Sequence, residues 1–495
     1  MTNDHNNQFS LPRRRFLQGM GGAGATALGL GACGFPSTFG YSGQDLVQPP
    51  VEKSKDGLLQ TKVVAQMGSF NLGGQDVYLR CYNGRPVGNT LDFHAGDTVK
   101  LQLTNKLPFE PFAGICKALP DEANTPHGFN VTNMHVHGLH VSPKAPSDDI
   151  LLAVLPAGGS YNYEYHIPKD HPPGTYFYHA HVHGSTAMQV SSGMSGCLIV
   201  RGAVDEIPEI KAAKEQVLMI QTQRFDKQGQ CESFSLLNNG DKTYINGQYN
   251  PVIRIKKGEV QRWRIVNASH MVPFDLQIQT YRYTTTLPFT VLCYDGNPLP
   301  NTKEVEKIRM VAGNRVDVLV KGFDPGTYFL TGGDSAGTIA TVIIEDDDSD
   351  GDMPLYAGPL PTVPELTPIP ESEVTYGRRL EFGFVYGENA KFTVNNKPFS
   401  CDDPWEIPLN SVEEWDVYNH TAYPHPFHIH VNPFQVISGG GVDPGTWMDT
   451  LEFPPFERIK FRTRFSTFTG EFVFHCHNLM HEDMGMMQAV KVVDA

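Results

Sequence analysis

The sequence predicts an all-β protein built from three β-sandwich domains in series. Short apolar segments with the alternation of strands, separated by Gly, Pro and Asn turns, fill the chain after the N-terminal region, and few segments have a helical period. One sequence motif occurs three times, with copies about one domain length apart. The chain has 495 residues, of which 40% are hydrophobic and 19% charged, so three domains can each bury a core.

The repeated motif combines an Asn-Gly turn, a Gly-acid turn and a closing Asn. Its copies are YNGRPVGNTLDFHAGDTVKLQLTN (82–105), INGQYNPVIRIKKGEVQRWRIVN (245–267) and a fainter VNNKPFSCDDPWEIPLNSVEEWDVYN (394–419). The motif places the three domains at residues 58–202, 203–345 and 376–495. Residues 346–375 are acidic and then proline-rich, which predicts an extended connector between the second and third domains.

Residues 1–33 resemble a twin-arginine export signal, because RRRFLQ is followed by a Gly/Ala-rich apolar run too short to span a membrane. Such a signal carries folded proteins, so it predicts the export machinery as a partner and a periplasmic or other extracytoplasmic location. The run ends in LGAC, where Cys33 either becomes a lipid anchor or lies beside an ordinary cleavage site. Residues 34–57 are polar, as a linker requires.

Charge and cysteine usage exclude some functions. The formal net charge of -15 argues against a nucleic acid or an anionic membrane surface as a partner, and is compatible with cationic substrates or metal ions. Cys81, Cys197 and Cys293 lie in strand-like apolar segments, where a buried thiol is expected. An oxidising compartment would allow a bridge between Cys231 and Cys293.

The histidines form four clusters, each containing an H-x-H pair. In a β-strand alternate residues point to the same side, so each pair directs two imidazoles to one place. The pairs are His135 and His137, His179 and His181, His428 and His430, and His475 and His477. They belong to the first and third domains only. We therefore expect a metal site between those two domains, with the middle domain as a spacer.

A second metal site is predicted around Cys476, which faces away from His475 and His477 on the same strand. His425, His481 and Met486 can complete it. A thiolate, two imidazoles and a weak thioether are the ligand set of blue copper, which suits electron transfer. Zinc also binds His and Cys, but it has no use for an axial methionine and cannot carry electrons.

With these motifs the chain resembles three-domain multicopper oxidases, in particular laccase-like bacterial members. All four copper motifs occur in the family's order and spacing, and Met486 follows Cys476 at the axial position. The resemblance implies cupredoxin-like Greek-key domains and four copper ions. Type 1 copper would be bound by His425, Cys476, His481 and Met486, and type 2 copper by His135 and His428. The type 3 pair would be bound by His137, His179, His181, His430, His475 and His477.

The resemblance also implies a reaction: one-electron oxidation of diphenols, aromatic amines or similar small reductants, coupled to four-electron reduction of dioxygen to water. Glu482 resembles the family's acidic residue beside the cluster, and Asp148 or Asp149 is a second candidate proton donor. Either aspartate can instead be a solvated turn residue. The alternative function is a metallo-oxidase for Cu(I) or Fe(II). The third domain lacks a long methionine-rich insertion, which favours the laccase-like reading.

Overall fold

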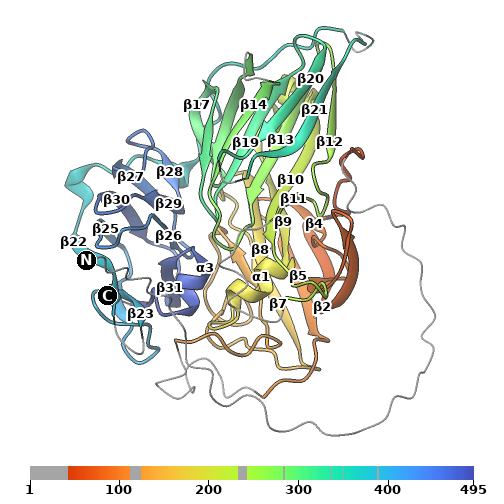
Figure 1. The fold of residues 1–495 in the computed structure, drawn as a ribbon. Helices are drawn as coiled ribbons and strands as arrows, with labels where there is room; N and C mark the ends of the chain where they lie inside the picture. The colour runs from red at the N-terminus through yellow and green to blue at the C-terminus, as the bar shows by residue number, and fades with distance from the viewer. Residues whose placement is uncertain are drawn as a thin grey trace, which may run out of the picture. The chain divides into compact units, whose positions relative to one another are not determined.

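The computed structural model describes residues 43–111, 124–231, 242–281, 285–334, 336–347, 349, 351–386 and 390–494. The export segment and Cys33 lie outside these residues. Six β-sheets form three sandwiches, coloured orange to yellow, green and blue in Figure 1, which confirms the predicted all-β fold. No helix in the described part of the chain is long and apolar enough to cross a membrane.

The first sandwich packs a five-stranded sheet on a four-stranded one around buried aromatic and aliphatic side chains. The larger sheet has the order β1 (Val51–Lys53), β4 (Thr90–His94), β9 (Ser195–Arg201), β8 (Gly174–His179), β6 (His135–His137). The smaller sheet has the order β3 (Gln75–Tyr82), β2 (Leu58–Leu72), β5 (Thr98–Asn105), β7 (Ser160–His166). Helix α1 (Thr186–Ser192) follows β8. Strand β1 pairs with β4, so part of the segment expected as a linker is packed on this domain.

The second sandwich contains two six-stranded sheets and follows η2 (Ala203–Glu206) and α2 (Pro208–Ala212). One sheet has the order β11 (Lys242–Ile245), β10 (Lys214–Gln223), β13 (Val260–Asn267), β19 (Arg315–Lys321), β16 (Phe289–Tyr294), β17 (Asn297–Val305). The other has the order β12 (Val252–Lys256), β21 (Thr338–Glu345), β20 (Gly326–Thr331), β14 (Phe274–Thr280), β15 (Thr286–Leu287), with β18 (Ile308–Met310) paired to β14.

The third sandwich follows a segment that contains the short helices η4 (Pro364–Leu366) and η5 (Glu371–Glu373). Its first sheet has the order β23 (Lys391–Val394), β22 (Tyr376–Val385), β25 (Ser411–Asn419), β30 (Arg458–Phe465), β27 (Phe434–Ser438), β28 (Trp447–Met448). Its second sheet has the order β24 (Trp405–Pro408), β32 (Met487–Val493), β31 (Gly470–Cys476), β26 (His425–Ile429), β29 (Thr450–Phe453). Helix α3 (Leu479–Asp483) follows β31 and contacts α1 of the first sandwich; both lie near the centre of Figure 1.

The three sandwiches share one pattern of strand pairing, which explains the sequence repeat. In each, four adjacent strands pair in the same order: the first and second are antiparallel, the second and third are parallel, and the third and fourth are antiparallel. The sets are β3-β2-β5-β7, β11-β10-β13-β19 and β23-β22-β25-β30. The turn asparagines Asn83, Asn246 and Asn395 all have positive φ, which Asn tolerates better than most residues.

The closing asparagine of each repeat is fully buried and fastens the next loop. Asn105, Asn267 and Asn419 each accept a hydrogen bond from the backbone N–H two residues later, at 2.9, 3.1 and 2.8 Å. Their side-chain amides donate to backbone carbonyls of other loops. In the third domain Asn419 also accepts from Thr421, whose Oγ1 lies 2.6 Å from His425 Nε2. The repeat therefore has a direct consequence for a predicted ligand.

The cysteines follow the prediction in part. Cys81, Cys197 and Cys293 are buried free thiols, as expected. The suggested bridge between Cys231 and Cys293 is wrong, because neither residue forms a disulfide and the two lie in different hydrophobic clusters. Cys231 Sγ contacts Met188 Sδ at 3.4 Å, whereas Cys293 faces the backbone of Pro173. Cys401 is disulfide-bonded.

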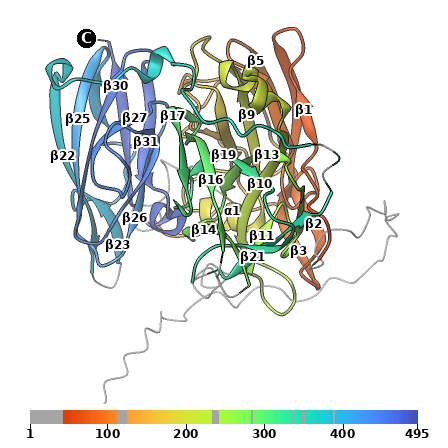
Figure 2. The same ribbon diagram turned by 90° about the horizontal axis from the view of Figure 1, so that it is seen from above.

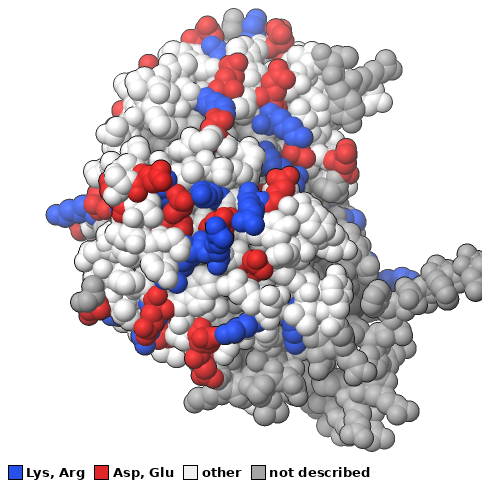
Figure 3. Space-filling view, turned by 90° about the vertical axis from the view of Figure 1, so that its left-hand side faces the viewer, with Lys and Arg blue, Asp and Glu red and all other residues white. Residues whose placement is uncertain are grey.

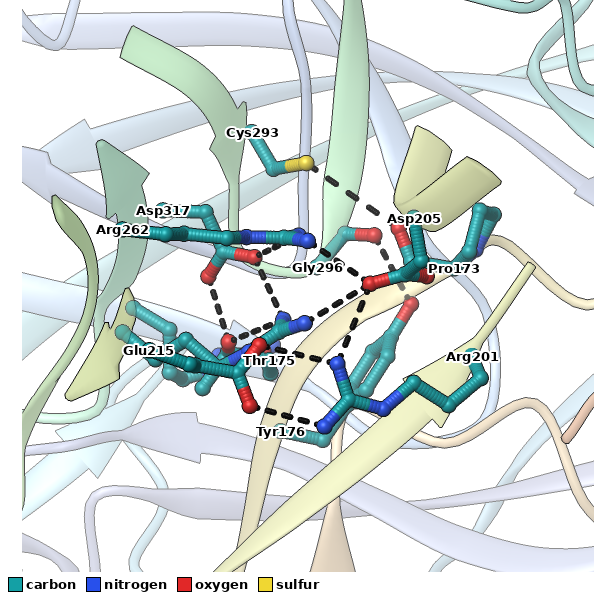
Figure 4. Close-up of polar contacts among 12 residues, drawn as sticks. Pro173, Thr175, Tyr176, Arg201, Asp205, Glu215, Arg262, Cys293, Gly296 and Asp317 are labelled. Atoms are coloured by element: carbon teal, nitrogen blue, oxygen red, sulfur yellow. Dashed lines mark hydrogen bonds and ion pairs between the residues drawn. The ribbon is translucent and has the colours of Figure 1, made fainter. Parts of the chain in front are cut away.

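A buried network of charges joins the first two sandwiches (Figure 4). Its members are Arg201, Asp205, Glu215, Arg262, Arg264 and Asp317. Arg264 is fully buried and contacts three of the carboxylates at 2.7 to 2.9 Å. Buried charges are tolerated only when paired in this way. Thr175 of β8 donates to Asp317 of β19, so the network fixes these two strands against each other.

Candidate metal centre

Strand pairing brings the predicted histidines together in two facing pairs of strands. In the first domain His135 of β6 lies opposite His179 of β8, and in the third domain His428 of β26 lies opposite His475 of β31. Alternation along each strand then places the partner histidine of each pair on the same side. The eight predicted imidazoles are all buried.

The two domains meet ring against ring at this site. The rings of His135 and His430 stack with centroids 3.8 Å apart, and those of His137 and His428 stack at 3.7 Å. His475 Nε2 lies 3.2 Å from both His181 Nε2 and His430 Nε2. Three imidazole nitrogens at such distances, from both domains, form a site for a metal ion. Sequence and structure therefore agree that the histidines converge between the first and third domains.

Several of these rings present a buried nitrogen that has no hydrogen-bond partner among the described residues. The atoms are His135 Nε2, His137 Nδ1, His179 Nε2, His428 Nε2 and both ring nitrogens of His477. A buried polar atom without a partner is costly, and coordination of a metal ion would remove that cost. Burial also lowers the pKa of His179 to about 3, which keeps this imidazole neutral and able to bind a metal.

A second cluster is formed by His425, Cys476 and His481 in the third domain. Cys476 Sγ lies 3.3 Å from His425 Nδ1 and 3.6 Å from His481 Nδ1, and the two nitrogens are 3.1 Å apart. Met486 is fully buried in the same core, and its carbonyl accepts a hydrogen bond from Cys476 N–H. Burial raises the pKa of the Cys476 thiol, so the thiolate needs a bound cation to be stable. This donor set fits copper.

The backbone of β31 connects the two clusters. In the pairing of β31 with β26, Cys476 lies opposite Phe427 and His475 lies opposite His428, and these consecutive pairs point to opposite faces of the sheet. The predicted alternation of HCH is thus present. His475 and His477 are the covalent neighbours of Cys476, so a few bonds separate the sulfur from the histidine-rich site.

The predicted acidic residues occupy different positions. Glu482 is fully buried, with Oε1 3.5 Å from His181 Nδ1 and Oε2 3.4 Å from His475 Nδ1. Thr186 of α1 donates to Glu482 Oε1 at 3.0 Å. Burial, and then the neighbouring charge of Asp483, raise the pKa of Glu482 well above its usual value. Asp483 itself accepts backbone N–H groups at the start of α1.

Asp148 and Asp149 are clearly distinguished by their contacts. Asp148 Oδ2 lies 2.8 Å from His135 Nδ1, and Oδ1 accepts from Val136 N–H. Burial raises the pKa of Asp148 to about 7. Asp149 is half-buried and accepts from Leu152 N–H within its own turn. Asp148 therefore contacts a predicted ligand histidine, whereas Asp149 hydrogen-bonds within its own turn.

Two further polar residues at the site were not predicted by the motifs: Asp449, which lies between β28 and β29, and Thr450, the first residue of β29. Asp449 Oδ1 lies 3.2 Å from His137 Nε2, and its carbonyl oxygen lies 2.9 Å from His428 Nδ1. The available signal was the polar pair Asp-Thr directly after the apolar Trp447–Met448, although nothing in its spacing points to the histidines.

Comparison with known proteins agrees with this geometry. Three family models, each described as multicopper oxidase, match residues 127–204, 213–347 and 374–495. The chain belongs to the multicopper oxidase family. It carries four copper ions, one of type 1, one of type 2 and a type 3 pair, and acts with dioxygen on a reducing substrate.

Similar proteins span most of this multicopper oxidase. The multicopper oxidase mco of Staphylococcus aureus is 26% identical over 435 residues, which are 83% of this chain and 83% of that protein. A laccase of Haloferax volcanii is 25% identical and covers 82% of this chain and 76% of its own. A Campylobacter jejuni multicopper oxidase, described as a metallo-oxidase, has a TM-score of 0.74 at 23% identity, over 92% of this chain and 97% of that chain. That likeness concerns the fold.

The first prediction concerns Cys476. Replacing it with Ser should abolish the intense blue absorption and substrate oxidation, because a hydroxyl cannot supply the soft thiolate contact. Copper bound at the histidine-rich site should remain, since those ligands are unchanged. Visible absorption and copper analysis of purified protein provide the measurement, and Cys197→Ser, at another buried free thiol, is the control. A blue Cys476→Ser variant would contradict the assignment.

Proposed function

We propose that the two clusters hold copper in the arrangement that the motifs predict. Type 1 copper is bound by His425, Cys476, His481 and Met486, and type 2 copper by His135 and His428. The type 3 pair is bound by His137, His179, His181, His430, His475 and His477. The observation that carries this assignment is the set of buried ring nitrogens without a protein partner.

The protein is a laccase-like oxidase that couples one-electron oxidation of small reductants to reduction of dioxygen to water. The copper ions supply the electron transfer and the oxygen chemistry. The chain orients their ligands, and it separates the sulfur-containing site from the dioxygen-binding site by the backbone between Cys476 and its two histidine neighbours. All of these ligands but His481 are buried, which excludes bulk water from the reaction.

Glu482 and Asp148 deliver protons to the reduced oxygen in this proposal. Each is buried, contacts a copper-ligand histidine, and has a pKa raised by burial. A carboxyl group whose pKa is raised can hold a proton near neutral pH and release it during turnover. Asp149 has no such contact among the described residues, and we assign it a structural role in its turn.

Aromatic side chains beside His481 favour phenols and aromatic amines as reductants. Phe392 stacks on the His481 ring at 3.9 Å, Phe384 lies 4.8 Å from Phe392, and Tyr386 lies 4.8 Å from Phe384. Tyr386 is 86% exposed, so this series of rings reaches from solvent to a type 1 ligand. A planar aromatic reductant can stack on such a surface. Oxidation of Cu(I) or Fe(II) is the alternative that the test below separates.

The N-terminal segment makes the enzyme an exported, periplasmic or extracytoplasmic protein in this proposal, delivered by the twin-arginine machinery and anchored through Cys33 if that residue is acylated. The charge supports the absence of a nucleic-acid partner. On the face shown in Figure 3 acidic and basic side chains are intermixed. The third domain contains ion pairs such as Arg462–Glu414 and Arg464–Glu373.

The reductant class is tested by comparing kcat/KM of the copper-loaded enzyme for a methoxyphenol, an aromatic amine, Cu(I) and Fe(II). We expect the aromatic reductants to be preferred, and Phe392→Leu to lower their kcat/KM more than that for Fe(II). Phe109→Leu, which alters an exposed ring of the first domain, is the control. A preference for the metal ions by orders of magnitude would establish the metallo-oxidase function instead.

The role of Glu482 is tested with Glu482→Gln, which keeps the shape but cannot release a proton. Copper content, blue colour and anaerobic reduction by substrate should stay near the parent values, whereas reoxidation of the fully reduced enzyme by dioxygen should slow. Stopped-flow absorption follows the reoxidation. Asp149→Asn is the matched control, and a parent-like reoxidation rate for Glu482→Gln would remove the proton-delivery role.

The lipid anchor is tested by mass spectrometry of the mature N-terminus from the native host. An acylated peptide that begins at Cys33, together with recovery of the enzyme in the membrane fraction, is the expected result, because a multiply acylated cysteine binds membranes firmly. An unmodified peptide that begins beyond residue 33 would instead identify an ordinary cleavage site.

A further inference from the structure

The middle domain reaches the histidine-rich site through the start of β19. Arg315, the first residue of that strand, is fully buried. Its Nη1 donates to Asp449 Oδ1 at 2.8 Å, and its Nη2 donates to Asp449 Oδ2, so one guanidinium grips both carboxylate oxygens. Such a bidentate pair fixes orientation as well as distance. The middle domain is therefore more than the spacer that the sequence suggested.

Asp449, a residue of the third domain, contacts predicted ligands of both the first and the third domain. Its Oδ1 lies 3.2 Å from Nε2 of His137, a residue of the first domain, and its carbonyl lies 2.9 Å from Nδ1 of His428, a residue of the third. Thr450 Oγ1 lies 3.2 Å and 3.1 Å from the same two nitrogens. The opposite nitrogens, His137 Nδ1 and His428 Nε2, have no hydrogen-bond partner among the residues that the structure describes.

The backbone that carries Asp449 is also held by the middle domain. Asn314 donates to the carbonyl of Thr450 at 2.8 Å, and Asp295 Oδ2 accepts from Thr450 N–H at 3.2 Å. Asp295 Oδ1 in turn accepts from Arg315 N–H at 2.9 Å. Three residues of the second domain, Asp295, Asn314 and Arg315, thus fix both the side chain of Asp449 and the backbone of this third-domain segment.

Strand β19 is anchored to the first domain as well. Arg315 Nε contacts the carbonyl of Thr175, and the guanidinium lies 5.6 Å from the centre of the Tyr176 ring. Two residues further on, Asp317 accepts from Thr175 and pairs with Arg264 at 2.7 Å (Figure 4). The approach is close: a Cβ on Gly138, the residue after His137, would lie 2.3 Å from Arg315 Nη2.

We infer that Arg315 is a positioning residue through which the middle domain sets the geometry and affinity of the type 2 copper site, acting by way of Asp449 on the proposed type 2 ligand His428 and also contacting, through Asp449, the proposed type 3 ligand His137. The inference rests on the proposed ligand assignment. A buried ion pair adds little to stability compared with apolar packing, whereas its fixed geometry suits the support of metal ligands. Outer contacts of this kind affect metal affinity by about 10- to 100-fold.

The test is Arg315→Lys in the full-length, copper-loaded enzyme. Lysine keeps the charge but is a point charge that cannot grip both carboxylate oxygens. We expect type 2 copper to be lost to a competing chelator at about 10- to 100-fold lower chelator concentration, and the type 2 hyperfine splitting in the electron paramagnetic resonance spectrum to change. The blue absorption and anaerobic reduction of type 1 copper should match the parent, because the hydrogen bonds of Arg315 within the described part of the chain go to Thr175, Asp295, Gly313 and Asp449, and none of these residues is a proposed type 1 ligand.

Arg264→Lys is the matched control, since Arg264 is an equally buried arginine in the same interface that does not contact Asp449. It should lower the melting temperature and leave the type 2 spectrum unchanged. Parent-like type 2 affinity and spectrum in Arg315→Lys would overturn the inference, as would an equal change in Arg264→Lys. If Arg315→Lys yields no blue protein, Asn314→Ser is the substitute test. We expect this variant to show a smaller change in type 2 affinity and spectrum in the same direction. Parent-like type 2 affinity and spectrum in Asn314→Ser would overturn the inference.

A wrong ligand assignment gives a different result. His428→Ala should remove type 2 copper outright if His428 is a ligand of that ion. Retention of type 2 copper in His428→Ala would refute the assignment itself, whereas its loss there combined with parent-like behaviour of Arg315→Lys would refute only the positioning role.

Discussion

A metal-binding imidazole has to leave one nitrogen free of protein partners, so its other nitrogen and its ring faces must hold it in place. Much of the structure near the site meets this requirement. His135 is held through Nδ1 by Asp148, His428 by the carbonyl of Asp449, and His179 and His475 by backbone carbonyls next to them in the chain. Ring stacking across the two domains restrains His137 and His430. Such outer contacts fix the tautomer and orientation of a metal ligand.

The histidine-rich metal site needs two sandwiches, because one pair of strands can supply histidines from only one side of the site. The pair β6 and β8 faces the pair β26 and β31, and the histidines of both meet between the domains. Side chains along β31 alternate between the two faces of the sheet, so Cys476 points into the core of the third domain while the neighbouring histidines point toward the first domain. The separation of electron uptake from oxygen reduction is thus a consequence of strand geometry.

The sequence predicted what depends on local pattern. Strand alternation gave the all-β class and the convergence of the H-x-H pairs, and the three asparagine-ended repeats gave three similar sandwiches, because these features are determined within about 25 residues. Contacts between distant segments were not predictable in this way. Which of Asp148 and Asp149 contacts a ligand histidine depends on the conformation of a loop, which the sequence does not determine. The predicted bridge between Cys231 and Cys293 was wrong because tertiary packing places Cys231 against Met188.

Arg315 and Asp449 show the same limit more strongly. An arginine at the start of an apolar strand normally indicates a solvated edge, and an aspartate before a short strand indicates a turn. Here both are buried, since three domains close around them. The proposed ligands of the type 2 and type 3 ions come from different domains, so the packing of the domains determines the geometry of these ligands. A directional pair of charges at the junction solves it better than apolar contact, because apolar contact has no preferred angle.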